Sequence, residues 1–294
     1  MITEGRKLLG SLEGAIAQAG VDASAQAPGF QESVAAGDWA SAFHSFTLFH
    51  LITVGACAII TGVLIALGLR WRGTPRERKL RLGVVWSTFL WQSWAVVYYL
   101  TPPNLKPEES LPLHVCDVAA WIAPLALLLQ KRWLRIVLYY WGIGLSTQAF
   151  VTPVVQDGYG AWKFWLFWVG HTQIVGSACY DILVLRFRPS WRDFWIGVLI
   201  TLLYTIGLML PFNTITGFNY AYVGNTRPDR PTIIDKLGPW PLRVVWMSAI
   251  VFVLFLLITL VWPLARWVGL ISDEHPDSAT ESRPDDAGRA APAA

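Results

Sequence analysis

Residues that could carry out chemistry gather in one short segment and on one distant apolar stretch. The segment Leu111-Pro-Leu-His-Val-Cys-Asp117 holds an imidazole, a thiol and a carboxylate within two helical turns. A second imidazole, His171, lies 55 residues after Cys116. A cysteine becomes a strong nucleophile when a nearby base removes its proton, and histidine often serves as that base. These residue types therefore favour covalent catalysis by a cysteine activated by a histidine.

The spacing within the segment decides which histidine could serve Cys116. His114 and Asp117 stand three residues apart, share one face of a helix and could hydrogen-bond to each other. Cys116 is two residues from His114 and points in another direction, so His171 must be the base if Cys116 is catalytic. Pro112 suits the first turn of a helix, and the positive potential of that helix end would stabilise a thiolate on Cys116.

The composition shows that membrane helices must position these residues. The chain has 294 residues, of which 54% are hydrophobic and 15% charged, and its mean hydropathy is +0.44. Such a chain is too apolar for a soluble domain, and its apolar runs are long enough to cross a bilayer. We therefore predict an all-α polytopic membrane protein, a bundle of seven transmembrane helices. The helices are expected at about 43–69, 82–100, 111–130, 133–152, 162–185, 192–211 and 242–265.

The distribution of basic residues predicts the orientation. Most of the 23 lysines and arginines lie in the connections after the first, third and fifth helices or in the C-terminal tail. Positive residues favour the cytoplasmic side, so the N-terminus is expected outside and the C-terminus in the cytoplasm. Residues 1–42 form an extracytoplasmic segment, 43–265 the transmembrane domain, and 266–294 a disordered cytoplasmic tail. Residues 212–241 form a folded cap over the outer mouth.

This orientation brings several polar groups to one level in the outer half of the bilayer. Ionisable groups inside membrane helices are costly, so each is a candidate site. The group at this level comprises His50, Gln92, His114, Cys116, Asp117, Gln148 and His171. Asp181 lies toward the cytoplasmic side and is expected to pair with Arg186 and Arg188. From residue types alone, a reactive cluster and a set of packing and helix-linking residues remain equally good interpretations.

The ordered motifs resemble a known family. Besides Leu111–Asp117 with Val118-Ala-Ala-Trp121, they include Phe46-Thr-Leu-Phe-His50, Trp168-Val-Gly-His171, Asn219-Tyr220, Arg227-Pro228 and Leu237-Gly-Pro-Trp-Pro241. Together they resemble the bacterial YwaF-type membrane proteins, whose eukaryotic relatives are the transmembrane protein 164 group. The resemblance spans roughly residues 43–265. It implies a seven-helix membrane protein in which the cysteine and the histidine face one cavity.

The resemblance also implies an activity, since the eukaryotic branch resembles an acyltransferase that moves fatty acyl chains between glycerophospholipids. Its active-site cysteine and histidine correspond to Cys116 and His171. The expected partners are phospholipids and lyso-lipids of the cell membrane, with no cofactor, no metal and no nucleic acid.

Further roles are assigned from side-chain type. His50, Gln92, His114 and Asp117 are expected to support or orient the site. Gln148, Asn219 or Tyr220 could donate a hydrogen bond to an oxyanion, and Arg227 could bind a lipid phosphate.

Two alternatives from other classes remain open. The first is a zinc-dependent lipid hydrolase in which His50, His114 and His171, with Asp117 or Cys116, hold the metal and its activated water. The second is a non-catalytic protein that binds or carries a lipid or a small solute, and in which the polar cluster only recognises a head group.

Overall fold

The computed structural model describes residues 39–225 and 233–269. All regular structure in these residues is helical, apart from one isolated antiparallel bridge between Ala42 and Asp157. The chain divides after Arg186 into two compact units, each described by itself below. The predicted N-terminal segment and C-terminal tail lie mostly outside the described residues.

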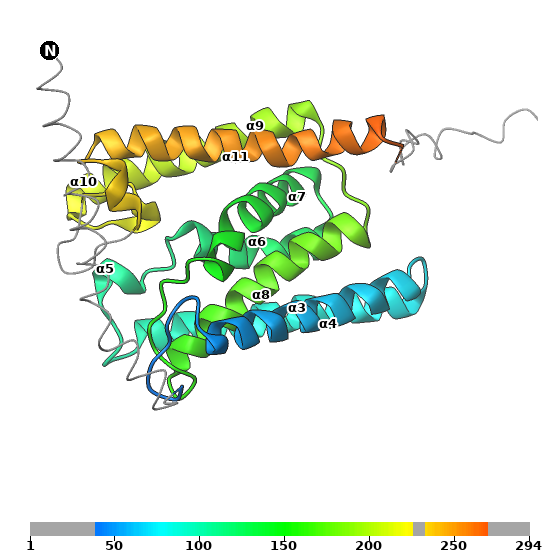
Figure 1. The fold of residues 1–294 in the computed structure, drawn as a ribbon, viewed down its shortest axis with the longest axis horizontal. Helices are drawn as coiled ribbons and strands as arrows, with labels where there is room; N and C mark the ends of the chain where they lie inside the picture. Colours follow the sequence, from blue (N-terminus) through cyan, green and yellow to red (C-terminus); the bar gives the residue numbers. More distant parts are fainter. Residues whose placement is uncertain (1–38, 226–232, 270–294) are drawn as a thin grey trace, which may run out of the picture. The chain divides into compact units, whose positions relative to one another are not determined.

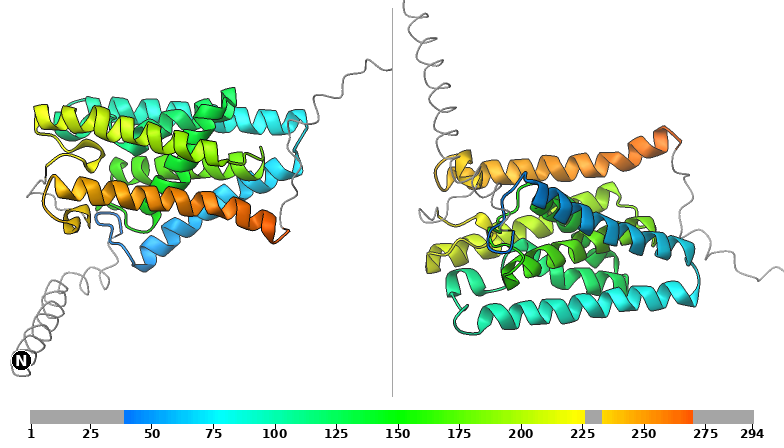
Figure 2. Two further views of the ribbon diagram at one scale, coloured as in Figure 1. Left: turned by 90° about the horizontal axis from the view of Figure 1, so that it is seen from above. Right: turned by 60° about the horizontal axis from the view of Figure 1, so that its bottom comes forward.

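The first unit contains the long helices α3 (Leu48–Arg70), α4 (Pro75–Leu100) and α8 (Trp162–Leu183) and the shorter α5 (Pro107–Ser110) and α6 (Val115–Leu129). A further stretch begins as α7 (Arg132–Val137) and continues as a π-helix, η1 (Leu138–Leu145), and a 3₁₀-helix, η2 (Ser146–Phe150). Helices α3 and α4 run antiparallel and are joined by a tight turn (Figure 2).

The long helices begin where the sequence can satisfy their first N–H groups. The hydroxyl of Thr47 accepts a hydrogen bond from the N–H of His50 at 3.2 Å, which starts α3. Helix α4 begins at Pro75, whose missing N–H costs nothing in the first turn.

Small residues let the helices of the first unit approach closely around α6. Helix α6 packs against α4, α8 and η1, and α8 also packs against α3 and α4 (Figure 1). Ala123 and Ala126 of α6 are fully buried beside Ala178 of α8. A Cβ added to Gly142 of η1 would lie only 2.9 Å from the Cβ of Ala178. This close packing is typical of helices that associate within a membrane.

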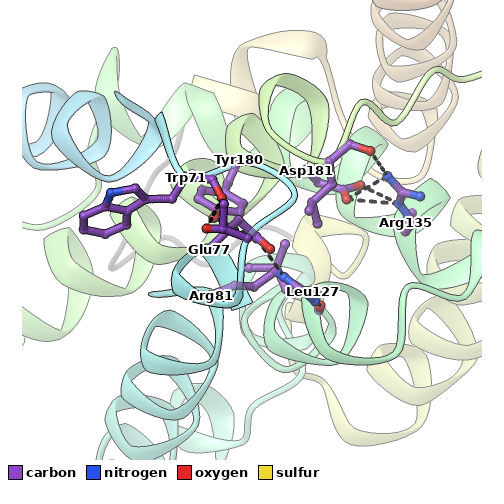
Figure 3. A network of polar contacts seen from close by, with 9 residues as sticks. Trp71, Glu77, Arg81, Leu127, Arg135, Tyr180 and Asp181 are labelled. Carbon is purple, nitrogen blue, oxygen red and sulfur yellow. Dashed lines mark hydrogen bonds and ion pairs between the residues drawn. The ribbon is translucent and has the colours of Figure 1, made fainter. Parts of the chain in front are cut away.

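A polar network joins four of these helical segments at the end of the unit away from Cys116 (Figure 3). Glu77 of α4 pairs with Arg81 at 3.0 Å and accepts a hydrogen bond from the Tyr180 hydroxyl at 2.9 Å. The guanidinium of Arg81 donates to the carbonyl of Leu127 on α6 at 2.6 Å. The network therefore ties α4 to both α6 and α8.

Asp181 takes part in an ion pair, but its partner differs from the predicted one. Its carboxylate, 2% exposed, binds Arg135 of α7 at 3.0 Å, and not Arg186 or Arg188. The expectation relied on closeness in sequence. In the structure, η1 and its neighbours pack against α8 and bring Arg135, 46 residues away in the chain, next to Asp181.

We expect the Arg135–Asp181 pair to respond differently to single and double substitution. Asp181→Ala should lower the free energy of unfolding by at most about 3–5 kcal/mol, because it removes the buried carboxylate that balances the charge of the partly buried Arg135 guanidinium. The double variant Arg135→Met, Asp181→Leu should recover most of that loss. Thermal unfolding of the purified protein in detergent measures both effects, with the exposed Arg192→Ala as control. A double variant no more stable than the single one would contradict this account of the pair.

The second unit consists of two long helical segments and the chain between them. The first segment runs through α9 (Trp191–Leu202), the π-helix η3 (Leu203–Met209) and α10 (Leu210–Thr216). Short 3₁₀-helices follow, η4 (Tyr220–Tyr222) and η5 (Ile233–Leu237), before α11 (Leu242–Trp267). Helices α9 and α11 pack against each other (Figure 1).

The described parts of the chain before α11 are folded. The side chain of Asn213 binds the backbone of Tyr220 twice, and the indole N–H of Trp240 donates to the carbonyl of Val223 at 3.1 Å. The buried Arg243 binds both Asp235 and the carbonyl of Gly224. These contacts fold the segment that we predicted as a cap; that it covers the outer mouth stays a prediction.

Three helical segments in the described part of the chain are long and apolar enough to cross a membrane: Leu48–Arg70, Trp191–Thr216 and Leu242–Trp267. Only 11%, 22% and 17% of the residues in their apolar windows are buried within the structure. A surface of exposed leucine, isoleucine and valine is stable against lipid but not against water. The chain is therefore a multi-pass membrane protein. That α4, α6, the α7–η2 stretch and α8 also cross the bilayer, and the orientation of the termini, remain predictions.

Candidate active site

Cys116 is the second residue of α6. The helix begins at Val115, and the sulfur of Cys116 lies against the backbone N–H groups of Cys116 itself and of Asp117. The first N–H groups of a helix have no partner within it, so they are free to bind a negative charge. The start of α6 thus places backbone N–H donors beside the thiol, whereas burial and the neighbouring Asp117 carboxylate oppose a thiolate there.

Asp117 helps to start this helix. Its carboxylate accepts a hydrogen bond from the backbone N–H of His114, the residue before the helix, at 3.0 Å. An acidic residue in the first turn also interacts favourably with the positive end of the helix. The spacing of His114 and Asp117 therefore serves helix initiation. The sequence suggested a hydrogen bond between the two side chains; instead, each side chain contacts the backbone of the other residue in a capping box.

The side chain of His171 is held in a single tautomer. Its Nδ1 lies 2.8 Å from the carbonyl oxygen of Phe167, one turn earlier in α8. A carbonyl oxygen can only accept, so Nδ1 carries the proton and donates it. The ring also packs on that of Phe167, with 4.3 Å between the centroids. Nε2 of neutral His171 therefore keeps its lone pair and has no hydrogen-bond partner among the described residues.

Cys116 and His171 lie on helices that pack directly against each other, α6 and α8. In the described structure no hydrogen bond or electrostatic interaction joins the two side chains. Catalytic hydrogen bonds are often long or poorly aligned without substrate and tighten only in the complex.

His50 has a structural place. Its ring is buried, with Nδ1 accepting from the N–H of Phe46 at 2.9 Å and Nε2 donating to the carbonyl of Phe150 at 3.1 Å. Both nitrogens are thus used by the backbone, and the ring packs against Phe43 and Trp168. His50 links the start of α3 to the chain after η1.

The remaining predicted residues are dispersed. Gln92 is buried on α4, whereas the Gln148 side chain is exposed at η2. Asn219 accepts a hydrogen bond from the N–H of Gly224 at 2.9 Å, and Tyr220 is buried; both belong to the second unit. Arg227 lies outside the described residues.

Tyr99 was not predicted from the sequence, yet it lies on α4, a helix that packs against the helix of the cysteine. It is in the last turn of α4, and electrostatic interactions link its hydroxyl to Asp117, Asp157 and Cys116. A search for ionisable residues in apolar stretches passes over tyrosine, because its side chain is neutral and common near membrane surfaces. Its position next to the connection that leads to Cys116 is the signal that could have found it.

Metal binding has little support from the described residues. No three histidine, cysteine, aspartate or glutamate side chains among them gather closely enough to hold an ion. His50, one of the ligands considered above, would have to give up a backbone hydrogen bond to bind one.

The sequence of the helical region matches a known protein family. The model of the TMEM164 family matches residues 45–259, which includes every helix from α3 to most of α11. The chain belongs to the TMEM164 family. Cys116, His171 and Tyr99 all lie within the matched region. None of the curated proteins and none of the solved structures showed a significant match.

Proposed function

We propose that this member of the TMEM164 family is a cysteine-dependent acyltransferase that moves fatty acyl chains between glycerophospholipids of the cell membrane. The proposal rests on the surroundings of two side chains, a thiol and an imidazole, that lie on helices packed against each other. Cys116 lies against backbone N–H groups at the start of α6, and His171 on α8 presents an unprotonated Nε2. YwaF-type bacterial proteins, which the motifs resemble, would share this chemistry.

The first half-reaction forms a thioester. Nε2 of His171 takes the proton of the Cys116 thiol, and the thiolate attacks the carbonyl carbon of a phospholipid ester. The tetrahedral intermediate then collapses, the carbon–oxygen bond of the ester breaks, and the leaving lyso-lipid oxygen takes the proton from His171. The acyl chain remains on Cys116.

The second half-reaction reverses these steps with another acceptor. A lyso-lipid hydroxyl gives its proton to His171 and attacks the thioester carbonyl, and Cys116 leaves as the thiolate and regains the proton. Exclusion of water from the membrane-embedded site favours the lipid acceptor, since attack by water would release a fatty acid instead.

The neighbouring residues fit supporting roles in this scheme. Phe167 orients His171 through its carbonyl, and Asp117 fixes the start of the helix that carries Cys116. The backbone N–H of Cys116 lies at the sulfur and could donate a hydrogen bond to the oxygen that becomes negative. A site in the outer half of the bilayer follows from the predicted orientation.

Reconstituted protein tests the proposal. Proteoliposomes that contain a phospholipid with a deuterated acyl chain and an unlabelled lyso-phospholipid should yield deuterated diacyl product, measured by mass spectrometry. Free deuterated fatty acid as the main product would show a hydrolase. If neither product formed while the lipids bound, a carrier would replace the enzyme as the better account.

A further inference from the structure

Several helix ends meet at the end of the first unit that lies away from Cys116, and arginines hold them together. Arg72, in the turn between α3 and α4, donates to the carbonyl of Leu183 at the end of α8. Arg81 donates to the carbonyl of Leu127, near the end of α6 (Figure 3). The turn between α3 and α4, the junction of α6 and α7 and the end of α8 therefore lie together.

A second set of cations at this end is left over by the fold. These side chains are exposed and have no hydrogen bond or ion pair with another described residue: Arg70, Arg76, Arg78, Lys79, Lys131 and Arg186. Four of them flank the turn between α3 and α4, one joins α6 to α7, and one follows α8. Together they form the basic surface of the first unit, and they are available to a partner.

Among the described residues, no acidic side chain at this end is free to balance that charge. Glu77 and Asp181, the two acids here, are buried and bound to arginines that do not belong to the basic surface. The other acidic residues of the described first unit lie at its opposite end: Glu108, Glu109, Asp117 and Asp157. The surface therefore carries charge of one sign, whose mutual repulsion an anionic partner would relieve.

The basic surface lies at the level of lipid head groups. Helix α3 is one of the segments long and apolar enough to cross a membrane, and a helix of this length spans about 35 Å. Arg70 is its last residue, so the charges begin where the hydrocarbon core ends. Trp133, close to Lys131, is exposed, as is typical of tryptophan at a membrane–water interface. The anions that face this surface are thus lipid phosphates.

We propose that the basic surface binds anionic phospholipids, so that the protein gathers acidic lipids around the first unit in preference to zwitterionic ones. The partner class is a phospholipid with a net negative charge, such as phosphatidylglycerol. The predicted orientation places this end in the cytoplasmic leaflet, whose surface is negatively charged. The proposal goes beyond the proposed function and does not depend on acyl transfer.

Native mass spectrometry of the purified protein in detergent tests the preference, with phosphatidylglycerol and phosphatidylcholine of the same acyl chains as probes. The unsubstituted protein should bind phosphatidylglycerol about tenfold more tightly at low ionic strength, and salt should reduce this preference, because it screens exposed charges. The double variant Arg78→Gln, Lys79→Gln should weaken phosphatidylglycerol binding by about 25-fold, since each cation near an anionic surface contributes about fivefold. Its binding of phosphatidylcholine should change less than about twofold.

Two further variants separate charge from folding. Arg78→Lys with Lys79→Arg keeps both charges and should bind as the unsubstituted protein does. Lys106→Gln with Lys163→Gln removes two cations at the opposite end of the unit and should leave phosphatidylglycerol binding within about twofold. Thermal unfolding of each variant checks its fold.

Equal binding of the two lipids by the unsubstituted protein would overturn the proposal, and so would a glutamine variant that keeps the full preference. An equal loss in the charge-keeping variant would overturn it too, because it would show a disturbed fold and not a lost charge. Displacement of the lipid by an equal concentration of glycerol phosphate would also overturn it, since it would show a site for a soluble phosphate ester.

Discussion

Cys116→Ala is expected to reduce acyl transfer between phospholipids to the rate of liposomes without protein. Removal of a covalent nucleophile has cost other enzymes on the order of 10⁶-fold in turnover, because the two-step route is lost entirely. The protein should still fold, since alanine fits the space of a cysteine and favours the helix in which Cys116 stands. Transfer of a deuterated acyl chain in proteoliposomes measures the effect.

The two other cysteines are matched controls. Cys57 on α3 and Cys179 on α8 are both free and partly buried. Cys57→Ala and Cys179→Ala should each keep transfer within about twofold of the unsubstituted protein, because neither sulfur lies at the start of a helix. Retention of transfer in Cys116→Ala would rule out a thioester and return attention to the metal and carrier alternatives.

His171→Ala is expected to slow thioester formation by about 10²–10⁴-fold, the typical contribution of a general base. The cysteine remains, so slow acylation should persist and should rise with added imidazole, which can take the proton in solution. His171→Gln serves as a second variant. It keeps a polar side chain on α8 and should be as slow as His171→Ala, since an amide is not a base.

The exposed histidine His44 supplies the control for this series. His44→Ala should acylate at the rate of the unsubstituted protein. The base assignment would be wrong if His171→Ala, with unchanged thermal unfolding, formed the acyl adduct at the original rate. If His171→Ala lost acylation and also unfolded at a lower temperature, His171 would have a structural role in the packing of α8 instead.

The positions of helices could be predicted from the sequence, but their internal geometry could not. A continuous helix was expected at 133–152, where the structure has α7, a π-helix and a 3₁₀-helix in succession. An apolar run predicts a helix but does not show whether each N–H bonds to the fourth preceding carbonyl, as in an α-helix, or to the fifth, as in a π-helix. Gly142 lies close to Ala178 of α8. Such a contact between helices cannot be predicted from the local sequence.

The end of the helix before the predicted cap shows a similar limit. The apolar run weakens at Phe212, but α10 continues to Thr216 and stops at Gly217, whose φ of 75° ends the helix. Asn213, expected in a loop, lies in the helix and binds the backbone of Tyr220. Helix-ending glycines are better markers of this boundary than hydropathy.

The sequence singles out the candidate reactive residues but not their surroundings; that Cys116 and His171 react stays a prediction. Cys116 and His171 are marked by residue type, since few thiols and imidazoles interrupt the apolar stretches. The side chains of His50 and Asp117 hydrogen-bond to backbone groups. Every residue has such groups, so these partners could not be predicted from the sequence. The same holds for the Phe167 carbonyl that orients His171.

The central claim, a thioester on Cys116, is tested most directly by trapping it. Purified protein is incubated with a phospholipid that carries an alkyne-tagged acyl chain, digested, and searched for the labelled peptide before and after hydroxylamine. The account predicts one hydroxylamine-labile acyl group on Cys116, greatly reduced in His171→Ala and absent in Cys116→Ala. Active protein that carries no acyl group on Cys116, or that keeps its label after hydroxylamine, would contradict it.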